Sequence, residues 1–257
     1  MQNRRTDEGE RCLPWAAHDG YSTDLDEFEK QGFIVFPTLL NDHASEALRR
    51  EINLFVEARM DLAVLLPNHA DLVTHPRLLA IAASLMRGRN FGFHHLHSAR
   101  HDVGTEALCW HHDYEQAPQS SRTHTMLHFF IYPTGLDGTV GDLLLLPGSH
   151  RTVLARNSMS HLGSAILTNT VVIDNLPPGS VVAVHSALHH ARRAKPGGEG
   201  APRYFVDISY CQEGRLWPAY VERGDWRQIL ALLRARDLAR GGHLQWLFRE
   251  DYFNAHN

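Results

Sequence analysis

Cysteine is scarce in this sequence. Only Cys12, Cys109 and Cys211 occur among the 257 residues, and no two of them form a CxxC pair. Their odd number and wide spacing argue against a disulfide framework and against a thiolate zinc site. A reducing compartment such as the cytoplasm is therefore the simplest location for the chain.

The sequence also lacks an excess of one charge and a long apolar run. Its 25 basic and 29 acidic residues leave a formal net charge of -4, which implies no general attraction to nucleic acid or to an anionic membrane. The longest aliphatic run, Leu143–Leu146, is too short to span a bilayer, and the polar first residues do not resemble a signal peptide. We therefore expect a cytoplasmic protein that binds a small molecule, and its oligomeric state stays open.

Histidine, in contrast, is abundant. The chain has 19 histidines, several of them clustered, in a composition that is otherwise ordinary. The count alone assigns no function. The length suits one domain over residues 1–257, in which residues 1–23 are predicted to form an N-terminal arm because they carry charges and little periodicity.

Apolar spacing predicts helices at the two ends of the chain. Helical periodicity and capping residues indicate helices over residues 24–31, 42–59, 76–88 and 225–240. A short strand is expected at Phe33–Phe36, where Pro37 ends an apolar run. The first third is therefore predicted to be mostly helical.

After Arg89 the pattern changes to strands. They are expected at residues 91–100, 125–133, 143–147, 170–174, 180–186 and 203–210, separated by Gly, Pro and Asp turns. No long helical pattern divides them, which favours an antiparallel sandwich or barrel over a parallel sheet. The fold class is thus mainly β with flanking helices. Residues 151–170 and 191–202 are expected to be long connections of the kind that forms lids.

A histidine and a carboxylate stand two residues apart at His111 and Asp113. Alternate side chains of an extended strand point to the same face, so both could bind one ion. His190, which follows the strand-like run Gly179–Val184, offers a third ligand. Two imidazoles and one carboxylate suit Fe(II) with open positions, as in the facial triad of oxygen-activating iron enzymes. A histidine–carboxylate pair in a barrel wall, without metal, is the competing interpretation.

The same spacing occurs at His69 and Asp71, so the spacing alone has low specificity. This pair follows Pro67 and Asn68 in a turn-like stretch ahead of a helix, where aspartate is more often a cap or turn residue. We expect a polar surface there rather than a metal site.

An arginine opens the last predicted strand. Arg203 directly precedes the apolar run Tyr204–Val206. A guanidinium at this place could form a bidentate pair with the distal carboxylate of a keto acid.

Several motifs follow one another in a definite order. They are Phe28-x-x-x-Gly32-Phe33-Ile34-Val35, Trp110-His111-His112-Asp113, Gly141-Asp142-Leu143-x-x-x-Pro147-Gly148-Ser149-His150, the segment from Gly179 to His190, and Arg203. In this order the sequence resembles the phytanoyl-CoA dioxygenase family over roughly residues 24–211. The resemblance implies a double-stranded β-helix, a jelly-roll or cupin-like core, that binds Fe(II) and the co-substrate 2-oxoglutarate and uses dioxygen.

The resemblance also implies roles for individual residues. It carries metal ligation, and with it catalysis, onto His111, Asp113 and His190, and it places the cofactor carboxylate at Arg203. In the family, the strand that corresponds to residues 91–100 lines the cofactor pocket. Ser98, and with it Arg100, is therefore a candidate for contact with 2-oxoglutarate or substrate.

The surroundings of the distal histidine differ from the family pattern. His189 is the alternative ligand, but the register from Gly179 in the resemblance favours His190, and adjacent strand residues face opposite ways. By the same alternation, His112 should point away from the metal. The basic cluster Arg192-Arg193-Ala194-Lys195 either borders the pocket mouth or forms a solvated loop.

The resemblance implies a 2-oxoglutarate-dependent oxygenase, most simply a hydroxylase of a small molecule, with a specialised-metabolite pathway as the favoured setting. Because Asp113 completes the triad, hydroxylation is favoured over the halogenation seen in relatives that lack this carboxylate. Desaturation, cyclisation and epimerisation stay open. The competing hypotheses are a cupin-like hydrolase or isomerase that uses the triad without a keto acid, and a non-catalytic binding protein.

Overall fold

The computed structural model of the chain describes residues 11–12, 25–88, 91–114, 122, 124–195, 197–214, 217–218 and 223–252. The predicted N-terminal arm lies outside these residues except for β1 (Arg11–Cys12), which runs parallel to β8 (Val171–Ile173). The arm otherwise stays a prediction.

Two five-stranded sheets form the centre of the molecule. The major sheet has the order β2 (Phe33–Phe36), β10 (Ser180–His185), β5 (Met126–Tyr132), β12 (Arg203–Gln212) and β3 (Phe91–His101). The minor sheet has the order β1, β8, β7 (Asp142–Leu145), β11 (His190–Arg193) and β4 (Leu108–His111). Except for β1 with β8, the pairs within both sheets are antiparallel, and β6 (Leu136–Asp137) and β9 (Asn175–Leu176) add a short ribbon. This arrangement agrees with the predicted antiparallel sandwich.

Strand β10 shows how the sequence forms two apolar layers. Its residues are apolar on both faces because both faces are buried. Val182 and Val184 join the apolar cluster that connects the two sheets, whereas Val181 and Ala183 join the cluster beneath the helices. The major sheet therefore lies between the minor sheet and a helical layer.

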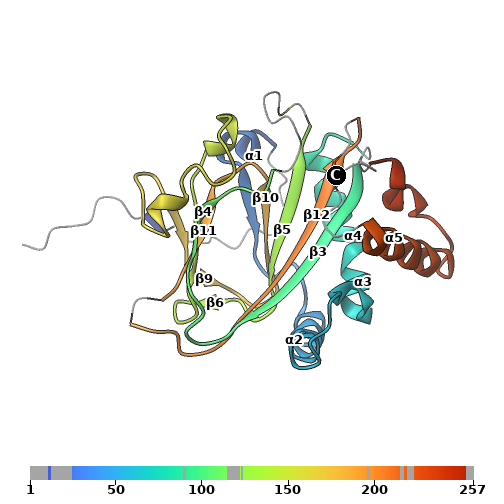
Figure 1. The fold of residues 1–257 in the computed structure, drawn as a ribbon, viewed down its shortest axis with the longest axis horizontal. Helices are drawn as coiled ribbons and strands as arrows, with labels where there is room; N and C mark the ends of the chain where they lie inside the picture. Colours follow the sequence, from blue (N-terminus) through green and yellow to red (C-terminus); the bar gives the residue numbers. More distant parts are fainter. Residues whose placement is uncertain are drawn as a thin grey trace, which may run out of the picture.

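Helices cover the outer face of the major sheet, beyond β3 and β12 (Figure 1). They are α2 (Asp42–Glu57), α3 (Pro67–Val73), α4 (Pro76–Leu85) and α5 (Arg223–Leu238), while α1 (Leu25–Gln31) precedes β2. Short 3₁₀ turns are η1 (Ala63–Leu65), η2 (Ser149–Arg151), η3 (Ser160–Leu162), η4 (Gln245–Phe248) and η5 (Glu250–Tyr252). Over the part of the chain that the structure describes, no helix combines the length and hydropathy needed to cross a membrane.

Two predictions of local structure are wrong. The stretch around His69 and Asp71 is not a turn but helix α3, and His69 is fully buried. The expected connection 191–202 begins as strand β11, because its arginines are not solvated: Arg193 forms an ion pair with Asp142 on β7. Ion pairing between strands, and not solvation, accommodates the charges of this segment.

A glycine with positive φ brings two of the sequence motifs together. Gly32 has φ +87°, and a Cβ there would lie 2.5 Å from His150 Nδ1. The Pro147–His150 turn packs against this position, and His150 Nε2 donates to the carbonyl oxygen of Glu29 at 3.1 Å. The Ser149 hydroxyl accepts a hydrogen bond from the His189 backbone at 2.9 Å. The turn therefore fixes the chain just before β11, where His190 begins the strand.

Candidate functional site

His111, Asp113 and His190 converge at one end of the minor sheet. His111 ends β4, His190 begins β11, and the two are directly opposed across the strand pair, with ring centroids 4.3 Å apart. Asp113 lies just beyond β4, where its backbone N–H donates to the Ser186 carbonyl oxygen at 2.7 Å. Its Oδ2 lies 3.2 Å from His190 Nε2, and its Oδ1 lies 3.7 Å from His111 Nε2.

Backbone carbonyls orient both imidazoles. His111 Nδ1 donates to the carbonyl oxygen of Cys109 at 2.8 Å, and His190 Nδ1 donates to that of Leu188 at 3.0 Å. In the neutral rings both Nε2 atoms therefore carry lone pairs that face the Asp113 carboxylate. Such a set of facing acceptors fits a divalent cation placed between them.

The protonation states suit metal binding. Burial, followed by the neighbouring His190, lowers the pKa of His111 to about 4, which keeps the ring neutral near pH 7. Burial alone would raise the pKa of the Asp113 carboxyl, but His190, His128 and His111 hold it well below its usual value. Metal ligands must be deprotonated in this way.

An arginine that the sequence did not indicate reaches the triad. Arg156, in the connection after β7, donates from Nη2 to Asp113 Oδ1 at 3.1 Å. Its side chain is about half exposed. No local pattern marks it, because it comes from a loop far along the chain from Asp113.

The triad opens into a cavity of about 410 Å³ that also contains Arg203. Arg203 is buried, its Nη2 donates to the Tyr132 hydroxyl at 3.1 Å, and its guanidinium lies over the rings of Tyr132 and Phe205. Within the part of the chain described, its Nε and Nη1 atoms have no hydrogen-bond partner. A buried guanidinium with unsatisfied N–H groups fits a carboxylate ligand.

The two arginines of the basic cluster after His190 have different surroundings. Arg192 lines the cavity and is buried, donating to the carbonyl oxygens of Thr105 and Glu106 at 3.0 and 2.8 Å and to Glu199 Oε1 at 2.6 Å. Arg193 instead pairs with Asp142. Arg192 therefore adds a positive charge to the cavity wall, whereas Arg193 does not line it.

The neighbouring histidines face away from the triad, as alternation predicts. His112 Nε2 donates to the carbonyl oxygen of Leu154 at 3.0 Å, and the rings of His112 and His189 meet edge to face at 5.1 Å. The geometry therefore places His190, and not His189, beside Asp113.

The structure does not bring Ser98 to this cavity. Ser98 Oγ lies 3.0 Å from His69 Nε2, on the helical side of β3, and Arg100 binds Asp102 and Asn53. The cavity side of β3 instead presents His95, His97 and His101. Strand alternation allowed either face to line the cavity, so the role of Ser98 in binding 2-oxoglutarate or substrate stays a prediction that its position here does not support.

The second HxD pair is not assembled as a metal site. His69 Nδ1 lies 2.8 Å from Glu51 Oε2. Asp71 points elsewhere, to Arg236 and Arg240 at 2.8 and 2.7 Å. In helix α3 residues two apart do not share a face, so the two side chains separate.

The model of the family described as phytanoyl-CoA dioxygenase (PhyH) matches residues 55–195, which is more than half of the chain. No curated protein matches the sequence.

Solved structures share the fold at low identity. The epimerase SnoN, in complex with Fe³⁺, alpha ketoglutarate and nogalamycin RO, has a TM-score of 0.61 and 15% identity over 82% of this chain and 87% of its own. HygX from Streptomyces hygroscopicus, with nickel and 2-oxoglutarate bound, has a TM-score of 0.60 and 19% identity over 77% and 90%. The non-heme monooxygenase ThoJ, as a nickel complex, has a TM-score of 0.56 and 20% identity over 74% and 77%. These likenesses confirm the predicted jelly-roll fold.

Proposed function

Because this chain belongs to the phytanoyl-CoA dioxygenase family, we propose that it is an Fe(II)- and 2-oxoglutarate-dependent oxygenase with His111, Asp113 and His190 as metal ligands and catalytic centre. The observation that carries the proposal is the pair of Nε2 lone pairs facing the Asp113 carboxylate, in one cavity with the unsatisfied guanidinium of Arg203. The Fe³⁺ and alpha ketoglutarate bound by SnoN, and the 2-oxoglutarate bound by HygX, support this choice of ligands.

Arg203 is proposed to hold the distal carboxylate of 2-oxoglutarate. Its Nε and Nη1 supply donors, while Tyr132 restrains Nη2. The rings of Tyr132 and Phe205 remove the guanidinium from water, which strengthens its attraction for an anion. The keto acid would then lie between Arg203 and the metal.

Bound iron and 2-oxoglutarate would supply dioxygen activation coupled to decarboxylation of the keto acid to succinate and carbon dioxide. The residues of this chain orient the two groups and keep water from the centre. Asp113 fills the third protein position, which favours hydroxylation over halide transfer. We propose hydroxylation of a small molecule from a specialised-metabolite pathway, by one domain that includes both sheets and the helical layer.

The first test is succinate release by the full chain with Fe(II), ascorbate, 2-oxoglutarate and a panel of candidate substrates. Product mass separates the outcomes: a gain of one oxygen supports hydroxylation, whereas an unchanged mass with succinate release indicates epimerisation. No succinate with any substrate, together with hydrolysis or isomerisation that needs no keto acid, would overturn the oxygenase proposal.

The second test is the variant Arg203→Ala. Loss of hydrogen bonds to a charged group costs roughly 1.5–3 kcal/mol, so we expect the KM for 2-oxoglutarate to rise about 10- to 100-fold. The exposed Arg151→Ala serves as a control for the loss of one arginine. An unchanged KM for 2-oxoglutarate in Arg203→Ala would contradict the assigned role.

A further inference from the structure

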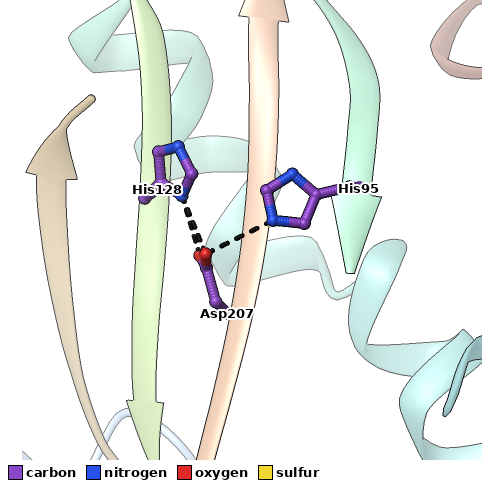
Figure 2. A group of neighbouring side chains, drawn as sticks. All are labelled: His95, His128 and Asp207. Atoms are coloured by element: carbon purple, nitrogen blue, oxygen red, sulfur yellow. Dashed lines mark hydrogen bonds and ion pairs between the residues drawn. The ribbon is translucent and has the colours of Figure 1, made fainter. Parts of the chain in front are cut away.

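A second group of two histidines and one carboxylate lies in the major sheet. His95 on β3, His128 on β5 and Asp207 on β12 converge from three neighbouring strands (Figure 2). His128 Nδ1 lies 3.0 Å from Asp207 Oδ1 and 2.9 Å from Oδ2, and His95 Nε2 lies 3.4 Å from Oδ2. One nitrogen or oxygen atom of each residue lies within 4.8 Å of the others. The group is as compact as the His111–Asp113–His190 triad, whose distances are 3.2 and 3.7 Å.

The register of the strands produces this convergence. Ser209 on β12 is the partner of His95 on one side and of His128 on the other. Directly opposed residues of neighbouring strands point to the same face, and Asp207 shares the face of Ser209 because it is two residues away. The three side chains therefore meet on the cavity side of the major sheet, where all three line the wall.

A bulge in β3 adds a fourth ring behind the group. The pairing of β12 with β3 shifts between Ser209 and Tyr210, whose partners are His95 and Phe93, so that His94 is the extra residue. A bulge lets two successive side chains approach the same partner. His94 Nδ1 and His95 Nδ1 accordingly lie 3.0 and 2.7 Å from Ser209 Oγ.

Two neighbouring groups, His94 and Ser209, contact Nδ1 of His95. His94 Nε2 donates to the Pro218 carbonyl oxygen at 2.9 Å, so its Nδ1 bears a lone pair in the neutral ring. Ser209 Oγ and His95 Nδ1 both lie 3.0 Å from that lone pair. The Ser209 hydroxyl donates either to His94 Nδ1 or to His95 Nδ1, which lies 2.7 Å away. In the first case, or where His95 Nδ1–H donates to His94 directly, His95 Nε2 carries a lone pair; in the second case His95 Nε2–H donates to Asp207. Metal binding at this place requires the form in which the His95 Nε2 lone pair faces Asp207.

The three side chains of this group are buried. His95, His128 and Asp207 have exposed fractions of 7%, 1% and 7%. A carboxylate in so buried a place is costly unless a positive group compensates it. His128 and His95 face the Asp207 carboxylate, and a divalent cation bound by all three residues would supply this compensation. In the first triad two imidazole nitrogens likewise face one carboxylate.

We propose that His95, His128 and Asp207 form a second metal site, which binds a divalent transition-metal ion such as Zn²⁺ or Fe²⁺. Two imidazoles and a carboxylate are suitable donors for these ions, and the positions they leave open face the cavity. An oxygen donor of water or of substrate could occupy such a position. This site is independent of the proposed function, because it uses none of the residues assigned there.

The alternative is a proton in place of the metal. A neutral His95 would then donate from Nε2–H to Asp207 and accept the Ser209 hydroxyl at Nδ1. This arrangement satisfies the same three side chains without any binding capacity, so metal stoichiometry distinguishes the two.

The test loads the full chain anaerobically with Co²⁺, removes weakly bound ions by desalting, and measures cobalt per chain by mass spectrometry and by visible absorption. We expect two equivalents in the wild type and one each in Asp113→Asn and Asp207→Asn. His97→Gln removes an imidazole that lines the same cavity from the same strand without belonging to either group, and should retain two.

One equivalent in the wild type, removed by Asp113→Asn and kept by Asp207→Asn, would overturn the second site. One equivalent removed by Asp207→Asn and kept by Asp113→Asn would instead contradict the ligands of the proposed function. If Asp207→Asn fails to fold by circular dichroism, His128→Gln replaces it. Even if neither Asp207→Asn nor His128→Gln folds, the cobalt counts of the wild type and of Asp113→Asn decide the matter. The proposal requires two equivalents in the wild type and one in Asp113→Asn.

Discussion

The two oxygens of Asp113 face different partners. Oδ2 lies toward His190 Nε2 at 3.2 Å, whereas Oδ1 accepts a hydrogen bond from Arg156 Nη2 at 3.1 Å. A ligand carboxylate whose second oxygen is hydrogen-bonded is held in one orientation, and partners of this kind tune metal affinity. Arg156 is therefore expected to position Asp113 without touching the metal.

Arg156→Met should weaken Fe(II) binding about 10-fold, at the lower end of the usual range for such partners because the arginine is half exposed. The dissociation constant is measured by anaerobic competition with a chelating dye. Arg151→Met, at an exposed arginine of the same connection, is the matched control. Equal affinities in the wild type and in Arg156→Met would show that Asp113 is oriented without Arg156.

Sequence patterns identify site residues only where the backbone itself brings them together. His111 and Asp113 were found because they are near neighbours, and the family-like order added His190 and Arg203. Arg156 carries no such signal, since a loop brings it to Asp113 from far along the chain. The metal roles of His111, Asp113 and His190 and the cofactor role of Arg203 stay predictions. All four residues line one cavity, which agrees with those roles.

Strand β11 is one of the elements that sequence reasoning missed. Its residues His190–Arg193 include two arginines, so polarity indicated a loop. The strand forms because each cation has a carboxylate partner: Asp142 for Arg193 and Glu199 for Arg192. Such pairs depend on tertiary structure and cannot be seen in a local pattern.

The buried pair of Arg192 and Glu199 is expected to stabilise this element. Glu199→Gln leaves the buried guanidinium without a countercharge, although the carbonyl oxygens of Thr105 and Glu106 remain as acceptors. The free energy of unfolding should therefore fall by about 3 kcal/mol, measured by urea unfolding. Glu250→Gln, which removes the exposed partner of Arg234, should cost less than about 1 kcal/mol. Equal losses in the two variants would contradict the prediction.

At the scale of the whole molecule, the fold class and the six main strands after Arg89 follow from the sequence, because runs of apolar residues mark them locally. The strand order does not, since it depends on long-range pairing such as β12 between β5 and β3. That order creates the row His95, Ser209 and His128. Hence the second histidine–carboxylate group could not be predicted without the register.

His185 connects parts of the molecule that are far apart in the sequence. It ends β10, and its ring lies 6.2 Å from Phe28, 5.1 Å from His150 and 6.4 Å from Tyr114, as centroid separations. Its Nδ1 accepts a hydrogen bond from the Ala187 backbone at 3.1 Å, which requires a lone pair. Burial, with smaller contributions from His150 and Arg122, lowers the pKa of His185 to about 3.

This low pKa makes stability depend on pH. Below about pH 6.5 the unfolded chain binds a proton at His185 that the folded chain accepts only near pH 3, so the contribution of His185 to stability is complete above pH 6.5 and is lost as the pH falls toward 3. Each unit in that window costs up to about 1.4 kcal/mol. His185→Gln removes this titration, and its free energy of unfolding, from urea curves at pH 7, 6 and 5, should fall less steeply than in the wild type. The exposed His43→Gln should keep the slope of the wild type. If His185→Gln also kept that slope, protonation of His185 would not be what couples pH to the stability of the fold.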